Sequence, residues 1–263
     1  MDIITLTTDF GLDDPYVAAM KGAILSINPQ LTIVDICHTI EPQNIAQAAF
    51  ILSTTYHYFP EGTIHIVVVD PGVGTERQAV LLVTPSAFFL APDNGVLSYM
   101  VEEAYELEAI AVTNPHFWLS PLSTTFHGRD IFAPVAAHLS LGVPPHEFGD
   151  PISSIFTFPI PQPRIGEDGV LVGHILHIDR FGNLITDIKR DDLPRGRLFI
   201  EIRGHIVDGL SYSYDEGDEL LAIIGSSERL EVSVKNSSAA RFLRAKMGDE
   251  VKVGINKSSM KGR

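Results

Sequence analysis

The apolar run 64-IHIVVV-69 constrains the fold more than any other segment of the sequence. A run that is apolar at nearly every position predicts a strand covered on both faces, as in a parallel sheet between layers of helices. Two strand-like segments precede it, at 2–8 and 31–36, and each is followed by a helix-like segment, at 15–27 and 44–59. This alternation predicts an α/β domain whose sheet is mainly parallel.

The segments after this run continue the same pattern up to about residue 150. Residues 79–84 and 87–91 are strand-like, and residues 95–104 and 130–139 are helix-like. We therefore expect residues 1–150 to form one α/β domain, with a buried core of the size that a chain of 263 residues allows.

The pattern changes in the remaining part of the chain. Residues 151–169 are rich in proline and lack a helical period, which predicts a linker. Residues 170–263 contain short strand-like segments separated by turn residues, and they predict a small antiparallel, barrel-like β domain. The segments in question are 170–179, 197–203, 219–225, 229–234 and 250–255.

The charge and cysteine content restrict the possible partners. The formal net charge is −14 at pH 7, which argues against nucleic acid or an anionic membrane surface as a partner, since both require a basic surface. The single cysteine, Cys37, excludes an intrachain disulfide and a cysteine-based metal cluster. The sequence shows neither a signal-peptide pattern nor an apolar run long enough to span a membrane, so we expect a cytoplasmic protein.

Polar residues follow several of the predicted strands of the first domain. Asp9 follows 2–8, Asp70 follows the run that ends at Val69, and Asn94 follows 87–91, while His127 precedes a predicted helix. Each residue also has an ordinary structural explanation as a turn or helix-cap residue. In an open α/β sheet, however, ligands bind beyond the carboxyl ends of the strands. The coincidence of these residues at one edge therefore predicts a binding site.

The second domain contains one further candidate segment, 178-IDRFGNLITDI-188. One interpretation is a simple hairpin, in which Gly182 and Asn183 supply the positive φ angles of a tight turn. The other is that Asp179, Phe181 and Asn183 form a recognition loop. The segment alone leaves both interpretations open.

The sequence supports a metal site only weakly. There are ten histidines, but no H-E-x-x-H motif occurs, and His174 and His177 face opposite sides of a predicted strand. A Mg²⁺ ion bound by Asp9, Asp13 and Asp14 has no further support. A P-loop and a G-x-S-x-G nucleophile elbow are both absent from the sequence.

Five motifs occur in a characteristic order: TDFGLDD, VDPGVGTER, APDNG, FHGRDIFAP and IDRFGNLIT. With these motifs the chain resembles the S-adenosyl-L-methionine hydroxide adenosyltransferases, which are similar to the fluorinating and chlorinating enzymes that act on the same substrate. The resemblance implies that S-adenosyl-L-methionine (SAM) and water give adenosine and L-methionine, without a cofactor. It also implies an α/β domain, a barrel-like β domain, and a homotrimer with sites between subunits.

The resemblance also implies roles for individual residues. The family's catalytic set matches Asp70, Arg77 and His127, and its ribose-binding acid matches Asp9. The family's loop that holds the methionine end matches 179–183, where Asp179 suits the methionine ammonium, and further contacts fall in 225–240. Asn94 is a separate candidate from its place after a strand. The candidates in the loop and in that segment are Asp179, Phe181, Asn183, Ser226, Ser227, Asn236 and Ser237.

The implied reaction is an in-line displacement at the ribose 5′ carbon, and two mechanisms are open. Asp70 and His127 accept hydrogen bonds or a proton from the water, with Arg77 keeping Asp70 ionised. Alternatively, Arg77 and a protonated His127 stabilise hydroxide. Three other functions also remain open: a SAM-dependent halogenase, a non-catalytic nucleoside- or SAM-binding module, and a hydrolase with a carboxylate-bound metal.

Overall fold

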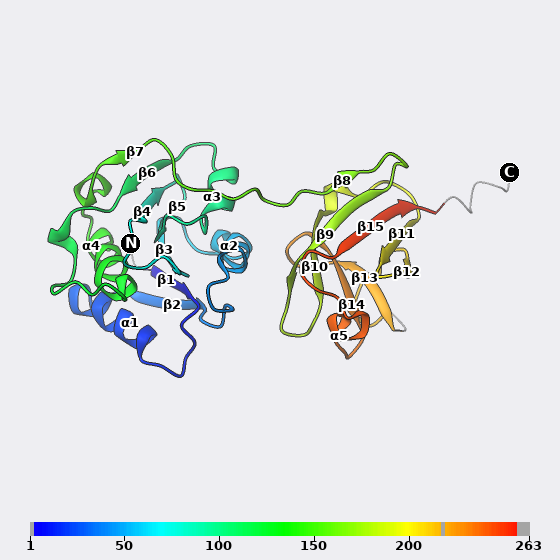
Figure 1. Cartoon of the computed structure of the whole chain (residues 1–263), viewed down its shortest axis with the longest axis horizontal. Coiled ribbons are helices and arrows are strands. Elements are labelled where there is room, and N and C mark those ends of the chain that lie inside the picture. The colour runs from blue at the N-terminus through cyan, green and yellow to red at the C-terminus, as the bar shows by residue number, and fades with distance from the viewer. Residues whose placement is uncertain (1–2, 217–218, 257–263) are drawn as a thin grey trace. The chain divides into compact units, whose positions relative to one another are not determined.

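The computed structural model describes residues 3–216 and 219–256. The chain divides into two compact units, Met1–Pro159 and Ile160–Arg263, which are described separately below (Figure 1). No helix among the described residues has both the length and the apolar character that crossing a membrane requires.

Unit 1 is built on a mixed sheet with the strand order β2-β1-β3-β5-β4-β6-β7. Four neighbouring strands are parallel, namely β1 (Ile3–Thr8), β2 (Thr32–Cys37), β3 (Thr63–Val68) and β5 (Ala87–Pro92). The other three pair antiparallel, namely β4 (Ala79–Val83), β6 (Glu108–Ala111) and β7 (Pro151–Ile152). The sheet is therefore only partly parallel. Residues 84–86, which join β4 to β5, are too few for the crossover that a parallel pair needs.

Helices cover both faces of this sheet. One face carries α1 (Tyr16–Ile27) and α4 (Ala133–Ser140), and the other carries α2 (Ile45–Ser53) and α3 (Ser98–Glu103). Right-handed crossovers place α1 and α2 on opposite faces because β1 lies between β2 and β3. As a result β3 is buried at every position, as the apolar run predicts.

The predicted helix over 44–59 begins as expected but ends early. The Asn44 side chain accepts from the backbone N–H of Gln47 and caps the first turn of α2. The helix ends at Ser53, where the hydroxyls of Thr54 and Thr55 bond back to the Ile51 carbonyl. The short helices of unit 1 are η1 (Tyr56–Tyr58), η2 (Pro115–Phe117), the π-helix η3 (Gly128–Phe132) and η4 (Pro145–Phe148).

Unit 2 is an antiparallel, barrel-like sheet with the order β12-β11-β15-β9-β10-β14-β13, and β8 pairs with β9. Its strands are β8 (Arg164–Ile165), β9 (Leu171–Ile178), β10 (Leu184–Lys189), β11 (Leu198–Ile202), β12 (His205–Asp208), β13 (Leu220–Ile224), β14 (Arg229–Val234) and β15 (Glu250–Ile255). Two short helices accompany them, η5 (Arg190–Asp192) and α5 (Ala239–Leu243). The proline-rich segment between the predicted domains also pairs at both ends, through β7 and β8.

The alternation of side chains in β14 separates two faces of this sheet. Leu230, Val232 and Val234 lie in the apolar core of unit 2. Because successive side chains of a strand point to opposite faces, Glu231 and Ser233 face away from that core.

Candidate active site

The carboxyl ends of β1 and β3 bring two predicted acids to one edge of the sheet. Thr8 and Val68 are register partners, so Asp9 and Asp70 follow neighbouring strand ends. Both line a cavity of about 300 Å³. The complete lining is Asp9, Phe10, Gln43, Val68, Asp70, Pro71, Val73, Thr125, Phe126, His127 and Gly128.

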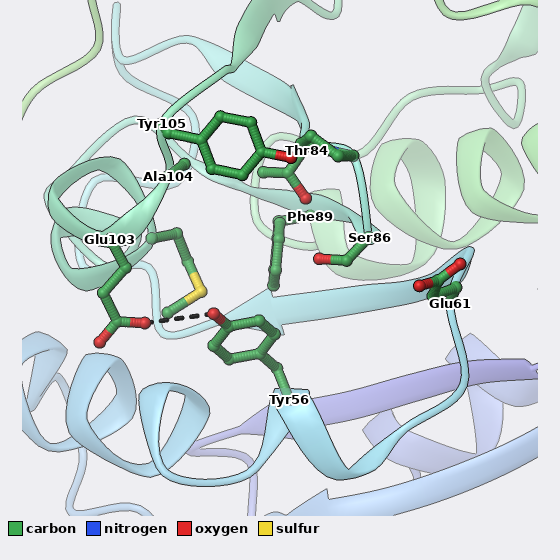
Figure 2. A pocket seen from close by; sticks show the side chains of 10 residues that line it. Tyr56, Glu61, Thr84, Ser86, Phe89, Glu103, Ala104 and Tyr105 are labelled. Atoms are coloured by element: carbon green, nitrogen blue, oxygen red, sulfur yellow. Dashed lines mark hydrogen bonds between the residues drawn. The ribbon is translucent and has the colours of Figure 1, made fainter.

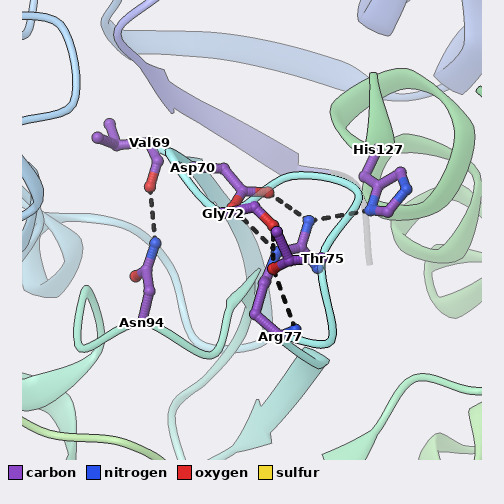
Figure 3. Close-up of polar contacts among 7 residues, drawn as sticks. All are labelled: Val69, Asp70, Gly72, Thr75, Arg77, Asn94 and His127. Atoms are coloured by element: carbon purple, nitrogen blue, oxygen red, sulfur yellow. Dashed lines mark hydrogen bonds and ion pairs between the residues drawn. The ribbon is translucent and has the colours of Figure 1, made fainter. Parts of the chain in front are cut away.

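Asp70, Arg77 and His127 form one connected cluster in the structure (Figure 3). Both oxygens of Asp70 accept from Arg77: Nε donates to Oδ1 over 2.9 Å, and Nη2 donates to Oδ2. The same Nη2 lies 3.0 Å from His127 Nδ1. The pair is well shielded, since the side chains of Arg77 and Asp70 are 10% and 5% exposed. A two-pronged ion pair of this kind fixes the direction of the carboxylate.

A glycine turn returns Arg77 to Asp70. Gly74 has φ of +77°, and a Cβ atom there would lie 2.3 Å from the Thr124 carbonyl oxygen. A residue with a side chain would therefore be strained and would also push the turn away from the segment that leads to His127. The turn thus depends on glycine at position 74.

The contact with Arg77 determines the protonation of His127. A guanidinium group only donates hydrogen bonds, so Nδ1 of His127 must accept, and the ring proton lies on Nε2. Burial, together with the positive charge of Arg77, lowers the pKa of His127, although Asp70 and Asp130 act in the opposite direction. Since its pKa is below the usual 6.5, His127 is mainly neutral at pH 7.

Asp130 positions the segment that carries His127 and does not line the cavity. Its carboxylate is buried and accepts from the Ser123 backbone N–H over 2.8 Å and from Arg129 Nε over 2.6 Å. Its backbone carbonyl accepts from Leu119 N–H over 2.8 Å. These bonds hold the loop before the π-helix η3, and π-helices often occur at functional sites.

Asn94 lies next to the Asp70–Arg77–His127 cluster without lining the cavity (Figure 3). Its amide donates to the Val69 carbonyl over 2.8 Å, and its Oδ1 accepts from the Val96 N–H. The side chain thereby fixes the backbone that leads directly into Asp70. A substrate contact by Asn94 stays a prediction.

Several cavity residues belong to no functional interpretation of the sequence. The Gln43 N–H donates to Asp9 Oδ2 over 2.8 Å, and Phe10 and Phe126 pack edge-on at 5.8 Å between ring centroids. Phe10 comes directly after Asp9, and Phe126 comes directly before His127. Their position beside these predicted site residues is the one feature of the sequence that indicates them. No feature of the sequence indicates Gln43, because only the folded chain brings it to Asp9.

The predicted recognition loop of unit 2 is a tight turn held by Asp179. Its Oδ1 accepts from the N–H groups of Phe181 and Asn183, and its Oδ2 accepts from the Asn183 amide over 2.9 Å. Gly182 has φ of +87°, and a Cβ there would lie 2.0 Å from Ser238 Oγ. The Phe181 side chain remains 76% exposed on top of this turn.

A second cavity, of about 680 Å³, surrounds this turn in unit 2. Its lining combines the predicted contacts with basic and aromatic side chains, namely Asp179, Arg180, Phe181, Asn183, Tyr214, Val234, Lys235, Asn236, Ser237 and Arg241. Ser226 and Ser227 do not line it, because they occupy the turn before β14, whereas Asn236 follows that strand. The structure therefore places the predicted contacts of 225–240 at both ends of β14.

A third cavity, of about 250 Å³, lies elsewhere in unit 1 (Figure 2). It is lined by residues before β3, in the β4–β5 connection, in β5 and in α3, among them Tyr56, Glu61, Ser86, Phe89 and Glu103. None of the predicted site residues lines it.

The described residues contain no group of three or more histidines, cysteines, aspartates or glutamates placed to hold a metal ion. Asp13 and Asp14 are exposed and do not line the cavity that contains Asp9. The structure thus does not bring the three acids together at that cavity.

Comparisons with known proteins agree with this arrangement. Residues 4–149 match the SAM hydroxide adenosyltransferase N-terminal domain, and residues 173–252 match the corresponding C-terminal domain. The chain is 35% identical to the (R)-S-adenosyl-L-methionine hydrolase of Methanocaldococcus jannaschii, with 96% of each chain covered. It is 32% identical to a fluorinase of Nocardia brasiliensis, with 73% of each covered. A crystal structure of an uncharacterized conserved protein from Thermotoga maritima matches with a TM-score of 0.88 and 35% identity, covering 95% of this chain and 99% of that one.

Proposed function

The chain belongs to the SAM hydroxide adenosyltransferase family, and we propose that it hydrolyses SAM to adenosine and L-methionine. In this reaction a water oxygen forms a bond to the ribose 5′ carbon while the bond from that carbon to sulfur breaks. The electron pair of that bond leaves on sulfur as the neutral thioether of methionine, and the water loses a proton. The observation that carries the proposal is the Asp70–Arg77–His127 cluster beside the cavity that also contains Asp9.

Asp70 and His127 suit a nucleophilic water from two sides. Asp70 retains acceptor capacity beyond its two bonds to Arg77, since a carboxylate offers about four lone-pair positions. His127 has its proton on Nε2 and can donate to the water oxygen. Water has a pKa of about 15.7, so it must lose its proton as it attacks, and Asp70 is the acceptor that this geometry favours.

The contact between Arg77 and His127 helps to choose between a neutral His127 that orients water and a protonated His127 that stabilises hydroxide. A protonated His127 would place a second cation against Arg77, and its Nδ1 would then be a donor facing a donor. The lowered pKa of His127 also opposes protonation. We therefore favour a neutral His127 that orients water over an imidazolium that stabilises hydroxide.

Asp9 is the acid that we assign to the ribose. Its Oδ2 accepts from Gln43 N–H, and among the described residues no donor binds Oδ1, so that oxygen can accept from a ribose hydroxyl. The rings of Phe10 and Phe126 supply an apolar wall in the same cavity. A water-poor wall of this kind strengthens the attraction between a developing hydroxide and the sulfonium.

Halide is a poorer nucleophile for this cavity. The carboxylate of Asp70 repels an anion, whereas it accepts a hydrogen bond from water. The chain is similar to fluorinases, but this geometry favours water over halide as the nucleophile.

Asp179, Phe181, Asn183, Ser226, Ser227 and Asn236 are further expected substrate contacts. We also expect a homotrimer with shared sites and no cofactor beyond SAM itself. Light scattering of the purified protein tests the oligomeric state, and activity after exhaustive chelation tests the absence of a metal requirement.

The proposed function is tested by incubating metal-free protein with SAM in ¹⁸O-labelled water and excess chloride. Mass spectrometry should show adenosine with one ¹⁸O atom and unlabelled methionine. Chlorinated adenosine would instead indicate halogenase activity, and unreacted SAM with measurable binding would indicate a non-catalytic module. D13N, which removes an exposed acid outside the cavity, serves as the control that should retain activity.

A further inference from the structure

A buried histidine beside the candidate active site lies in none of the five sequence motifs. His38 directly follows β2 and is only 4% exposed, and Thr8, the last residue of β1, is fully buried. The hydroxyl oxygen of Thr8 lies 2.9 Å from Nδ1 of His38. Burying two polar side chains costs free energy unless they bond to each other, so their contact is the first clue to what they do.

Two backbone hydrogen bonds connect this pair to the segment that carries Asp9. The Phe10 N–H donates to Thr8 Oγ1 over 3.2 Å, and the Gly11 N–H donates to the His38 carbonyl over 2.7 Å. Asp9 and Phe10 both line the cavity of unit 1. The backbone on either side of Asp9 is therefore fixed by Thr8 and His38.

An ion pair holds His38 from its other side. Its Nε2 lies 3.0 Å from Asp35 Oδ1, and Lys21 Nζ donates to Asp35 Oδ2 over 2.6 Å. Burial raises the pKa of Asp35, but the contacts with Lys21 and His38 together lower it by more, so this carboxylate is ionised at pH 7. The contacts thus run from α1, which carries Lys21, through β2, which carries Asp35, to the end of β1.

The partners of His38 determine the direction of the hydrogen bonds. An ionised carboxylate only accepts, so the contact with Asp35 places the ring proton on Nε2. Nδ1 must then accept from the Thr8 hydroxyl, and the lone pairs of Thr8 Oγ1 remain for the Phe10 N–H. His38 thereby orients the hydroxyl group that binds the backbone directly after Asp9.

Asp9 needs this support more than Asp70 does. Among the described residues, Asp9 accepts one hydrogen bond, from the Gln43 N–H, whereas both oxygens of Asp70 are bound by Arg77. One donor fixes the direction of a carboxylate less well than two donors of one guanidinium. The position of Asp9 therefore depends on its backbone, and a displacement of about 1 Å in a site can cost about 100-fold in rate.

We propose that His38 and Thr8 are positioning residues that hold Asp9 and Phe10 in place for the ribose of the substrate, an inference that rests on the proposed function. Neither His38 nor Thr8 lines the cavity, so both act through the backbone of 8–11. Asp35 keeps the His38 ring in the orientation that accepts from Thr8.

The same strand offers a matched control. Thr5 is also fully buried, and its hydroxyl oxygen lies 2.7 Å from Nδ1 of the buried His65. Thr5 lies three residues before the end of β1, and neither Thr5 nor His65 lines the cavity. T5V therefore removes the same kind of contact from the same strand as T8V does, but away from Asp9.

The test compares adenosine, a product of the proposed reaction, with 2′,3′-dideoxyadenosine, which lacks both ribose hydroxyls. Calorimetry gives the Kd of each nucleoside for the wild type and for T8V, T8S, H38L, H38N and T5V. Wild type, T8S and T5V should bind adenosine at least about thirtyfold more tightly than the analogue, since a site built to bond a hydroxyl rejects a ligand without one.

T8V and H38L should lose most of this preference. The ratio of the two Kd values should fall below about fivefold, while the Kd of the analogue changes by less than about twofold, because only the contact with the ribose hydroxyls depends on the direction of Asp9. H38N offers an amide oxygen that can accept from Thr8, so it should retain a higher ratio than H38L. A general loss of packing would weaken the binding of both nucleosides alike.

Three results would overturn the proposal: a wild-type ratio in T8V, an equal loss of the ratio in T5V, or a wild type that binds both nucleosides equally. A wild type that prefers adenosine but releases none from SAM would refute the proposed hydrolysis, and the comparison of T8V with T5V would still decide the role of His38 and Thr8. Amide-exchange protection of unit 1 shows whether each variant is folded. If H38L does not fold, T8V and T8S decide the outcome.

Discussion

The two units hold their principal carboxylates in opposite ways. In unit 1, the side chain of Asp70 is shielded from solvent, and both of its oxygens are paired with Arg77. In unit 2, Glu231 is buried with a tyrosine hydroxyl as its hydrogen-bond donor. A carboxylate bound by two donors of one guanidinium keeps a fixed direction, whereas burial raises the pKa of a carboxylate held by a hydroxyl, as in Glu231. The comparison shows that a buried carboxylate can be held by a charged partner in unit 1 and by a neutral one in unit 2.

The largest expected effect comes from breaking the ion pair of unit 1. Asp70→Asn should lower kcat by about 1,000-fold, equal to about 4 kcal/mol, because it removes the acceptor for the water proton. KM should change by less than about threefold, since Asp70 is assigned no bond to the substrate. Steady-state release of adenosine measures both constants. If Asp70→Asn keeps the wild-type kcat, the VDPGVGTER turn has a purely structural role.

The next prediction contrasts the response of the two units to acid. Burial lowers the pKa of His65 to about 4, so unit 1 holds this residue neutral. The unfolded chain binds a proton near pH 6.5, so unit 1 should lose up to about 3 kcal/mol of stability between pH 6.5 and 4.

Unit 2 should respond to acid in the opposite direction. Burial raises the pKa values of Asp187 and Glu231, so the folded unit binds protons more readily than the unfolded one. This contribution to stability is present at low pH and is lost as pH rises through the raised pKa values. Amide exchange read separately for each unit at pH 7 and 5 checks the contrast, and the fluorescence of Trp118 follows unit 1 alone. Parallel changes in both units would contradict it.

A smaller effect is expected for the residue that orients the water. His127→Phe should lower kcat/KM by about thirtyfold, equal to about 2 kcal/mol, through loss of one hydrogen-bond donor. Because the pKa of His127 is lowered and the proposed mechanism uses its neutral form, wild-type kcat/KM should fall as pH drops through a pKa that lies below 6.5. His127→Phe should lack this acid limb. If kcat/KM of His127→Phe still falls at low pH as in the wild type, another group is responsible for the titration.

The smallest prediction concerns the turn of unit 2. Gly182→Ala should destabilise unit 2 by at least about 1 kcal/mol more than Gly209→Ala does. Both glycines have positive φ, of +87° and +83°, but a Cβ meets Ser238 Oγ at 2.0 Å only at Gly182, and nothing lies within 4 Å at Gly209. Denaturant unfolding followed by amide exchange gives the difference. Equal losses would show that backbone strain, and not the packing of Ser238, limits this turn.

The sequence predicts the parts of the fold that depend on local pattern. The apolar run at 64–69 matches the buried strand β3, and the short turn-bounded segments after residue 170 match the antiparallel sheet of unit 2. The orientation of β4 was not predictable from its own residues, because an apolar strand reads alike in either direction. Its short connection to β5 contains the relevant signal, and the prediction of a mainly parallel sheet did not use it.

For the candidate site, too, the sequence indicates some residues, and only the folded chain reveals others. The motifs indicate Asp9, Asp70, Arg77 and His127, because each lies beside a strand end or in a glycine turn that local sequence reveals. Glu231 lies inside a regular strand, so the alternation of side chains predicts only that it faces away from the core. Its burial beneath Tyr214 depends on a loop that comes from another part of the chain.

The sequence by itself therefore determined which segments are strands and helices, which residues form turns, and which acids stand at strand ends. Hydrophobic periodicity and the special backbone angles of glycine act over a few residues, so they are legible in the chain. The tertiary structure alone decided that Arg77 makes Nδ1 of His127 an acceptor, that Asp179 accepts from its own turn, and that Tyr214 donates to Glu231. Hydrogen-bond partners and burial depend on groups far apart in the sequence, and only the folded chain brings these together.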